Sequence, residues 1–214
     1  LNTLLDAYLL ENDEYWLRHI ERVIRATIHP ADDLKKRDLL DVENRWSYLV
    51  LLASISRYLL VKQESQVFDD EYWYAFDSFV YYIDWLVSNE RPFLKYPAKL
   101  EFPNDTWAAQ DIRKAMLMFQ AASLQTSNSK AYAEQGWLWL NQVCTRLENS
   151  PEAGYTRIVA ILMQNYGPHQ FVRAVDNNNH SPERTSVIET IPPTLSWGVL
   201  SRRILGRIIS SLWR

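Results

Sequence analysis

The chain has 214 residues, of which 47% are hydrophobic and 23% charged, as expected for one globular domain with a substantial core. Its net charge of −3 argues against a general nucleic-acid-binding protein, because such proteins usually carry a basic stripe. Five glycines are few for this length, which disfavours a turn-rich all-β fold and a glycine-rich phosphate-binding loop.

Apolar residues recur at three- and four-residue spacing through the first two-thirds of the chain, which predicts amphipathic helices. The first is expected to follow Asn12 as its N-cap and to end before Pro30. A short helix over about 32–40 and a long one over about 41–61 come next. Further helices are predicted over 69–89, 106–124, 130–147 and 151–165, with an extended, proline-rich loop over 91–105.

Short turns between helices of this length predict an all-α fold of antiparallel helical hairpins. We expect the hairpin domain to span residues 1–175. An asparagine- and proline-rich linker over 176–195 and a last helix over 196–214 are expected to follow. Because the chain begins at Leu1 rather than Met, we expect a processed chain or part of a longer one. No apolar run is long enough to cross a membrane.

One face of the predicted 69–89 helix combines aromatic rings with carboxylates, which is unusual for a solvated surface. Aromatic rings can stack on the apolar faces of sugars, and carboxylates can bind hydroxyls or act as acid and base. Alternatively, the rings cover a neighbouring helix and the aspartates bond to it. The residues of this face are Tyr74, Asp77, Tyr81, Asp84 and Trp85.

The second candidate segment is a proline-fixed loop that runs directly into the predicted 106–124 helix. Glu101 and Asp105 lie in the loop, and the first turns of the helix carry Trp107, Asp111 and Lys114 on one stripe. The structural alternative is that Asp105 or Thr106 caps the helix and that Asp111 and Lys114 form an ion pair.

This loop followed by Thr-Trp-Ala-Ala-Gln-Asp-Ile-Arg-Lys, between long aromatic-rich hairpins, resembles part of the α/α-toroid, six-hairpin glycosidase-like proteins. The resemblance covers about 42–166. It implies a partial α/α-toroid-like array, such as the C-terminal portion of a larger ring, and a carbohydrate cleft formed by loops at one end of the inner helices. No pair of carboxylates matches a known catalytic pair, so the resemblance implies sugar handling more than hydrolysis.

The predicted C-terminal helix has a broad apolar sector with tryptophans near both ends, and basic residues opposite: Arg203, Arg207 and Arg214. Such a helix suits docking onto the body of the protein, onto a protein partner, or onto a membrane surface. Low cysteine use fits a reducing compartment, so we expect a cytoplasmic or membrane-peripheral protein.

The remaining reactive side chains point to no cofactor and no metal site. His19, His29, His169 and His180 lie far apart, without the spacing of metal ligands. The single cysteine, Cys144, lies in a helical pattern and is expected to be buried.

The leading functional hypothesis is a carbohydrate-binding or carbohydrate-processing α/α domain, either by itself or as part of a larger enzyme of polysaccharide metabolism. The candidate acids or bases are Glu101, Asp105, Asp77 and Asp84, and the candidate substrate-binding residues are Tyr74, Tyr81, Trp85, Trp107, Asp111 and Lys114. The alternative is a noncatalytic helical scaffold that binds a protein partner or a membrane surface through residues 196–214.

Overall fold

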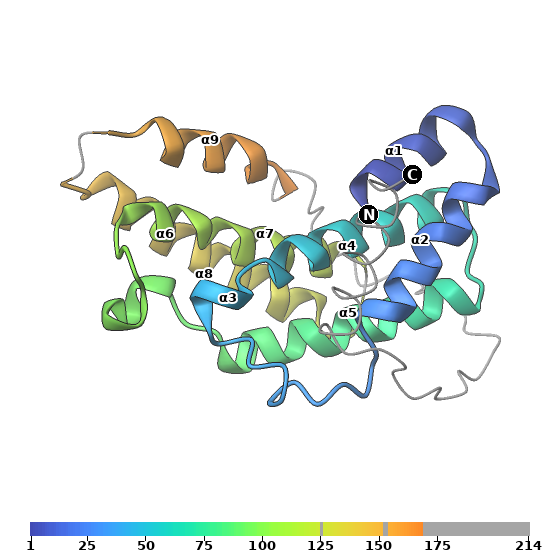
Figure 1. Ribbon diagram of the computed structural model, residues 1–214, viewed down its shortest axis with the longest axis horizontal. Helices are drawn as coiled ribbons and strands as arrows, with labels where there is room; N and C mark the ends of the chain where they lie inside the picture. Colours follow the sequence, from blue (N-terminus) through green and yellow to red (C-terminus); the bar gives the residue numbers. More distant parts are fainter. Residues whose placement is uncertain (125, 152–153, 169–214) are drawn as a thin grey trace, which may run out of the picture.

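The computed structural model describes residues 1–124, 126–151 and 154–168, and within these the chain is helical with no strand (Figure 1). The predicted all-α class of helical hairpins is confirmed. The linker predicted over 176–195 and the helix predicted over 196–214 lie outside the described residues. The elements in chain order are α1 (Asn2–Glu11), α2 (Glu14–Thr27), α3 (Val42–Arg45), α4 (Tyr48–Glu64), α5 (Asp70–Asn89), the short 3-10 helices η1 (Phe93–Lys95) and η2 (Pro97–Lys99), α6 (Asp105–Gln110), α7 (Ile112–Ser123), α8 (Ser129–Glu148) and α9 (Thr156–Asn165).

Figure 1 shows α1 and α2 at one end of the molecule and α6 and α9 towards the other, with α4, α5 and α7 running between them. The main hydrophobic core lies between α2, α4, α5 and α7, where Leu52, Tyr58 and Phe79 have no exposed surface. A second core joins α6, α7, α8 and α9 around Phe119. Helices α7 and α8 approach closely because Gly136 of α8 faces the ring of Phe119 without a side chain of its own.

Aspartates cap the N-termini of the two helices that frame the main core. Asp69 precedes α5 and begins it by accepting a hydrogen bond from the backbone N–H of Tyr72 at 2.9 Å. For α2 the predicted cap was one residue early. Asp13 accepts from the Tyr15 N–H at 2.8 Å, whereas Asn12 adopts a left-handed conformation that ends α1.

The short helix predicted over 32–40 is not formed; the chain there makes successive turns. The side chain of Asp32 explains the difference, because it accepts hydrogen bonds from the His29 N–H at 2.8 Å and from the Tyr82 hydroxyl at 2.7 Å. It also pairs with Arg37 at 2.8 Å. These bonds fix a loop against α5, and their free energy outweighs the local helical preference of the segment.

Two of the long predicted helices are divided. The helix predicted over 41–61 breaks between Arg45 and Tyr48, and the one predicted over 106–124 breaks at Asp111, which ends α6 and begins α7. The α6 cap is Asn104, which accepts from the Thr106 N–H at 2.9 Å, rather than Asp105 or Thr106 as predicted. The break at Asp111 directs its side chain towards η1, which positions the site described below.

Two further findings bear on the sequence predictions. Cys144 of α8 is exposed, so the prediction of a buried thiol was wrong: the apolar periodicity of α8 continues through Val143, and the next residue points outward. None of the described helices is both long enough and apolar enough to span a membrane.

Candidate functional site

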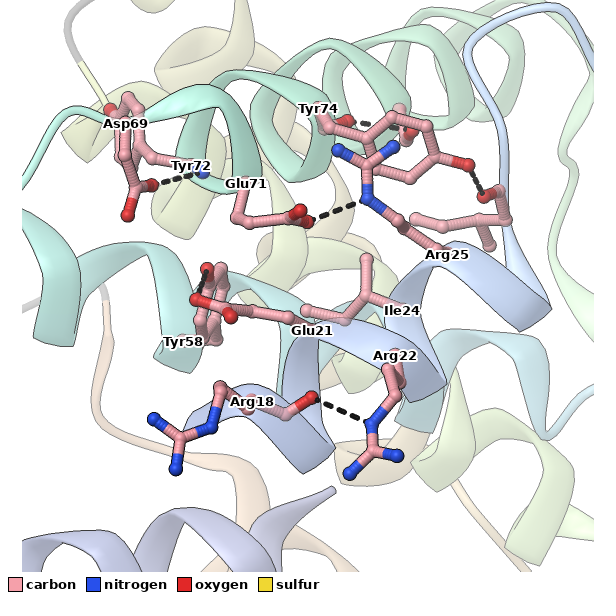
Figure 2. A network of polar contacts seen from close by, with 12 residues as sticks. Arg18, Glu21, Arg22, Ile24, Arg25, Tyr58, Asp69, Glu71, Tyr72 and Tyr74 are labelled. Carbon is pink, nitrogen blue, oxygen red and sulfur yellow. Dashed lines mark hydrogen bonds and ion pairs between the residues drawn. The ribbon is translucent and has the colours of Figure 1, made fainter. Parts of the chain in front are cut away.

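The aromatic residues at the start of the predicted α5 face are engaged in tertiary contacts. Tyr74 is buried, and its hydroxyl donates to the Ile28 carbonyl at 2.7 Å. Figure 2 shows Arg25 lying over the Tyr74 ring, 4.3 Å from its centroid, while its Nε bonds Glu71 at 2.7 Å. Burial raises the pKa of Tyr74 to about 12, against the opposing effect of Arg25. This tyrosine therefore holds the end of α2 against α5.

The remaining residues of that face contact different parts of the molecule. The Tyr81 hydroxyl donates to the Asp32 carbonyl at 2.9 Å, which adds a tie to the 28–41 loop. Asp84 is exposed and accepts from the Tyr132 hydroxyl of α8 at 2.5 Å. Trp85 is half-buried against the main core, and Asp77 is half-buried one turn earlier. The five residues are thus shared among several contacts and do not line one cleft together.

A second polar cluster beside α2 joins three helices, and Figure 2 shows one part of it, Tyr58 beside Glu21. The buried Lys62 of α4 contacts Glu21 of α2 at 3.0 Å and Asp69 at 2.6 Å. The Tyr58 hydroxyl donates to Glu21 at 3.1 Å, and burial raises the Tyr58 pKa well above its ordinary value. Because these groups bond one another, the cluster stabilises the packing of α2, α4 and α5.

The loop carboxylates of the second candidate segment are separated. Glu101 is exposed, and its backbone N–H donates to Glu43 at 2.7 Å. Asp105 is buried at the start of α6, where it accepts from Arg146 Nη2 at 2.7 Å and from the Ser150 hydroxyl. Burial acts to raise the pKa of Asp105, but the hydrogen bonds from Ser150 and Arg146 outweigh it and lower the pKa. Asp105 is thus a tie between α6 and the end of α8.

Trp107 lies half-buried on α6, with its ring packed edge-on against Phe93 at a centroid distance of 5.7 Å. It lines a small hollow of about 280 Å³ together with Trp46, Phe102 and Arg157. The Trp107 ring therefore faces a different depression from the one that Asp111 and Lys114 line.

The predicted ion pair between Asp111 and Lys114 is present, at 2.8 Å, and it belongs to a larger buried cluster. Lys114 Nζ also contacts Glu90 Oε2 at 2.9 Å and donates to the Arg91 carbonyl at 2.7 Å. Three acceptors match the three N–H groups of an ammonium. The Lys114 side chain is only 4% exposed, and that of Glu90 is 3% exposed, so the pair is removed from water.

Each carboxylate of this cluster has a further donor. The Tyr48 hydroxyl of α4 donates to Glu90 Oε1 at 2.5 Å, and the Phe93 N–H of η1 donates to Asp111 Oδ2 at 3.1 Å. The cluster thus joins α4, the end of α5, η1 and the α6–α7 junction. Burial raises the pKa of Tyr48 well above its ordinary value, and the negative charge of Glu90 adds to the shift. Tyr48 therefore keeps its proton and remains a donor.

Burial raises the pKa of Asp111 above its ordinary value, although the charge and hydrogen bond of Lys114 and the Phe93 N–H act in the opposite direction. The nearby Glu90 carboxylate also raises it. Burial thus acts against the charged form of Asp111, and the ion pair with Lys114 acts in its favour.

Glu90 and Tyr48 were not singled out from the sequence, yet a signal exists for one of them. Counting by helical spacing from Phe79, Ile83 and Leu86, the apolar stripe of α5 next reaches residue 90, where the sequence has a glutamate. A charge in line with an apolar stripe is costly to bury unless it is paired, so its presence indicates a buried partner. Nothing in the local sequence identifies Tyr48 as a donor to it.

The cluster borders a concave pocket of about 490 Å³ between the end of α5, η1, the α6–α7 junction and α8. Its apolar wall is formed by Val87, Pro92, Leu94, Ala108, Trp139 and Val143. Its polar lining consists of Glu90, Arg91, Lys95, Asp111, Lys114, Gln135, Gln142 and Arg146. A concave site that combines an apolar wall with convergent polar groups is typical of a small-molecule site.

Within residues 1–124, 126–151 and 154–168, no group of three or more histidine, cysteine, aspartate or glutamate side chains is arranged to hold a metal ion. Since Lys114 already engages both buried carboxylates, its charge occupies the position that a cation would take.

Comparison with known proteins found no family model that matches the chain, and no significant match to a curated protein or to a solved structure. The resemblance to the α/α-toroid proteins therefore stays a prediction, and the residues of the pocket are what bears on function.

Proposed function

We propose that the pocket between α5, η1 and α8 binds a saccharide and that the protein is a carbohydrate-binding or carbohydrate-processing domain. The observation that carries the proposal is the presence, in one concavity, of an indole ring, two side-chain amides and a buried pair of carboxylates: Trp139, Gln135, Gln142, Glu90 and Asp111. A sugar presents an apolar ring face and several hydroxyls, so it needs both kinds of surface from its binding site.

Binding is the better supported of these two roles. Glu90 Oε2 and Asp111 Oδ1 both contact Lys114 Nζ, at 2.9 and 2.8 Å, so the ammonium lies between the two carboxylates. In a retaining glycosidase the reacting sugar lies between the two carboxylates, which are about 5–5.5 Å apart. A processing role would therefore require Lys114 to leave its position, and hydrolysis of a bound oligosaccharide is the assay for it.

The test is calorimetric titration of the protein with a panel of oligosaccharides, comparing wild type with Trp139→Ala. We expect loss of the ring to weaken binding at least about tenfold, or roughly 1.4 kcal/mol. Trp137→Ala is the matched control, because Trp137 lies on the same helix and packs against Phe119 outside the pocket. Absence of binding by every saccharide, or equal losses in the two variants, would overturn the proposal.

A second pair of variants separates binding from folding, since Trp139 also packs against both hydrophobic cores. Gln142 lines the pocket and is exposed, whereas its neighbour Asn141 is exposed and does not line it. Gln142→Ala is expected to weaken the titrated saccharide, and Asn141→Ala to leave it unchanged, with the same melting temperature in both variants. An unchanged affinity in Gln142→Ala would place the ligand elsewhere.

A further inference from the structure

The charge of the pocket differs in sign from that of the chain. Four cationic side chains line the pocket against two carboxylates, in a protein whose overall net charge is −3. The cations are Arg91, Lys95, Lys114 and Arg146. An excess of positive charge in one concavity of an acidic protein raises the local concentration of anions there, because low-dielectric walls focus the field.

Burial divides these charges into a floor and a mouth. Lys114 and Glu90 are almost fully buried and contact each other, so the floor is internally paired. Arg91 and Lys95 are exposed, and the Arg146 side chain is 58% exposed. Because Arg146 is paired with Asp105, the unbalanced positive charge at the mouth comes from Arg91 and Lys95, where a ligand arrives from water.

The three cations at the mouth come from two different parts of the chain. Their existing hydrogen bonds leave further N–H donors available. Arg91 and Lys95 lie in the segment after α5, and Arg146 lies on α8. Arg91 Nη1 donates to its neighbouring carbonyl of Glu90 at 2.6 Å, and Arg146 uses Nε and Nη2 for Asp105. A guanidinium has five N–H donors, so both arginines can bond a further acceptor without breaking these contacts.

We propose that the saccharide is acidic, and that Arg91, Lys95 and Arg146 bind its carboxylate or phosphate group at the mouth of the pocket while the sugar ring lies against Trp139. This inference rests on the proposed saccharide site. It adds the chemical class of the ligand: a sugar that carries a negatively charged substituent, bound by charge-assisted hydrogen bonds from two sides.

Matched ligand pairs test the inference. One pair is a uronate oligosaccharide and its carboxyl-reduced neutral counterpart of the same linkage and length; the other is a hexose phosphate and the free hexose. Titrated into wild-type protein, the charged member of at least one pair is expected to bind tenfold or more tightly than its neutral partner. The pair that shows the difference identifies carboxylate or phosphate as the source of the charge. Affinity for the charged member should also fall as NaCl is raised, because the mouth cations are exposed.

Two charge-removing variants locate the effect. Arg91→Gln/Lys95→Gln is expected to weaken the charged ligand about tenfold and to leave the neutral one unchanged. Lys99→Gln is the matched control, since Lys99 lies in the adjacent η2, interacts with Tyr96 and does not line the pocket. A loss in Lys99→Gln equal to that of the double variant would overturn the inference.

The outcomes distinguish the two proposals. If neutral and charged members bind equally well and Trp139→Ala weakens both, the saccharide site stands and the acidic ligand is refuted. If neither member of either pair binds, both proposals fail. If the charged members bind but Trp139→Ala has no effect, the mouth of the pocket binds the anionic group alone. Both proposals are then refuted in so far as they concern a saccharide.

Discussion

Replacing Lys114 with methionine tests whether the buried cluster has the charges that its geometry indicates. Methionine has a similar length and no charge, so the change removes the cation and leaves Glu90 and Asp111 facing each other in a space closed to water. Their side chains are 3% and 12% exposed, so solvent can compensate little of the loss. Removal of one partner from a buried ion pair costs about 3–5 kcal/mol. For a chain of this size, that corresponds to a melting temperature lower by roughly 10 °C.

The cost is expected to depend on pH, and its sign follows from Asp111. Burial already holds the native pKa of Asp111 above its ordinary value, and the Lys114 charge acts to lower it. Removing that charge therefore raises the pKa of Asp111 further. When the pKa of Asp111 is higher in the folded state than in the unfolded state, the folded state binds more protons at pH values between the two pKa values. The free energy of unfolding of the variant therefore rises as the pH falls through this range. The loss relative to wild type should therefore be largest at pH 7.5 and smaller at pH 5.

The measurement is urea-induced unfolding at the two pH values, followed by tryptophan fluorescence and circular dichroism. Lys36→Met is the matched control, because the Lys36 side chain is 85% exposed and its ion pair with Asp33 lies on the surface. That variant should change the free energy of unfolding by no more than about 0.5 kcal/mol. A loss below about 1 kcal/mol in Lys114→Met, or the same loss at both pH values, would refute the reasoning about the buried charges.

Two further substitutions test the packing and the ties around the pocket. Gly136→Ala would bring a Cβ within 3.0 Å of the buried Phe119 ring, so we expect destabilisation by about 1–2 kcal/mol despite the better helix propensity of alanine. Gly154→Ala is the control: it has no neighbour within 4 Å and should leave the melting temperature unchanged. Asp105→Asn should lower the free energy of unfolding by about 1–3 kcal/mol at pH 7, because it weakens the bonds from Arg146. The native pKa of Asp105 is lowered, so its contribution is lost on protonation, and the difference from wild type should shrink as the pH falls below about 4. A difference in unfolding free energy that stays constant across this pH range would contradict this expectation.

The fold was predictable from sequence where local signals and apolar periodicity agree. Helix α5 has an aspartate cap followed by a long apolar stripe, and its predicted range of 69–89 matches Asp70–Asn89 closely. The loop over 28–41 was missed because its decisive bonds are distant in sequence: the Asp32 carboxylate accepts from the hydroxyl of Tyr82, fifty residues later. Local propensity carries no information about such a partner.

The candidate site was predictable in part, for the same reason. Spacing along one helix brought Asp111 and Lys114 together, and the structure contains that pair. Their partner Glu90 comes from the end of another helix, and Trp139 comes from α8, so only the packing of α5, α7 and α8 brings these residues to one pocket. Tyr74 and Tyr81 of the predicted α5 face donate to backbone carbonyls of residues 28 and 32, partners that spacing along α5 cannot identify.

Saccharide binding against Trp139 is tested most directly by recording the side-chain indole N–H spectrum of the protein during a saccharide titration. The chain has nine tryptophans, and Trp139→Phe assigns the resonance that matters. We expect a progressive shift of the Trp139 signal. The signal of Trp16, which is bonded to Glu11 on α1, should stay unchanged. A saccharide that binds while the Trp139 resonance stays fixed, or a panel in which no resonance moves, would contradict binding against Trp139.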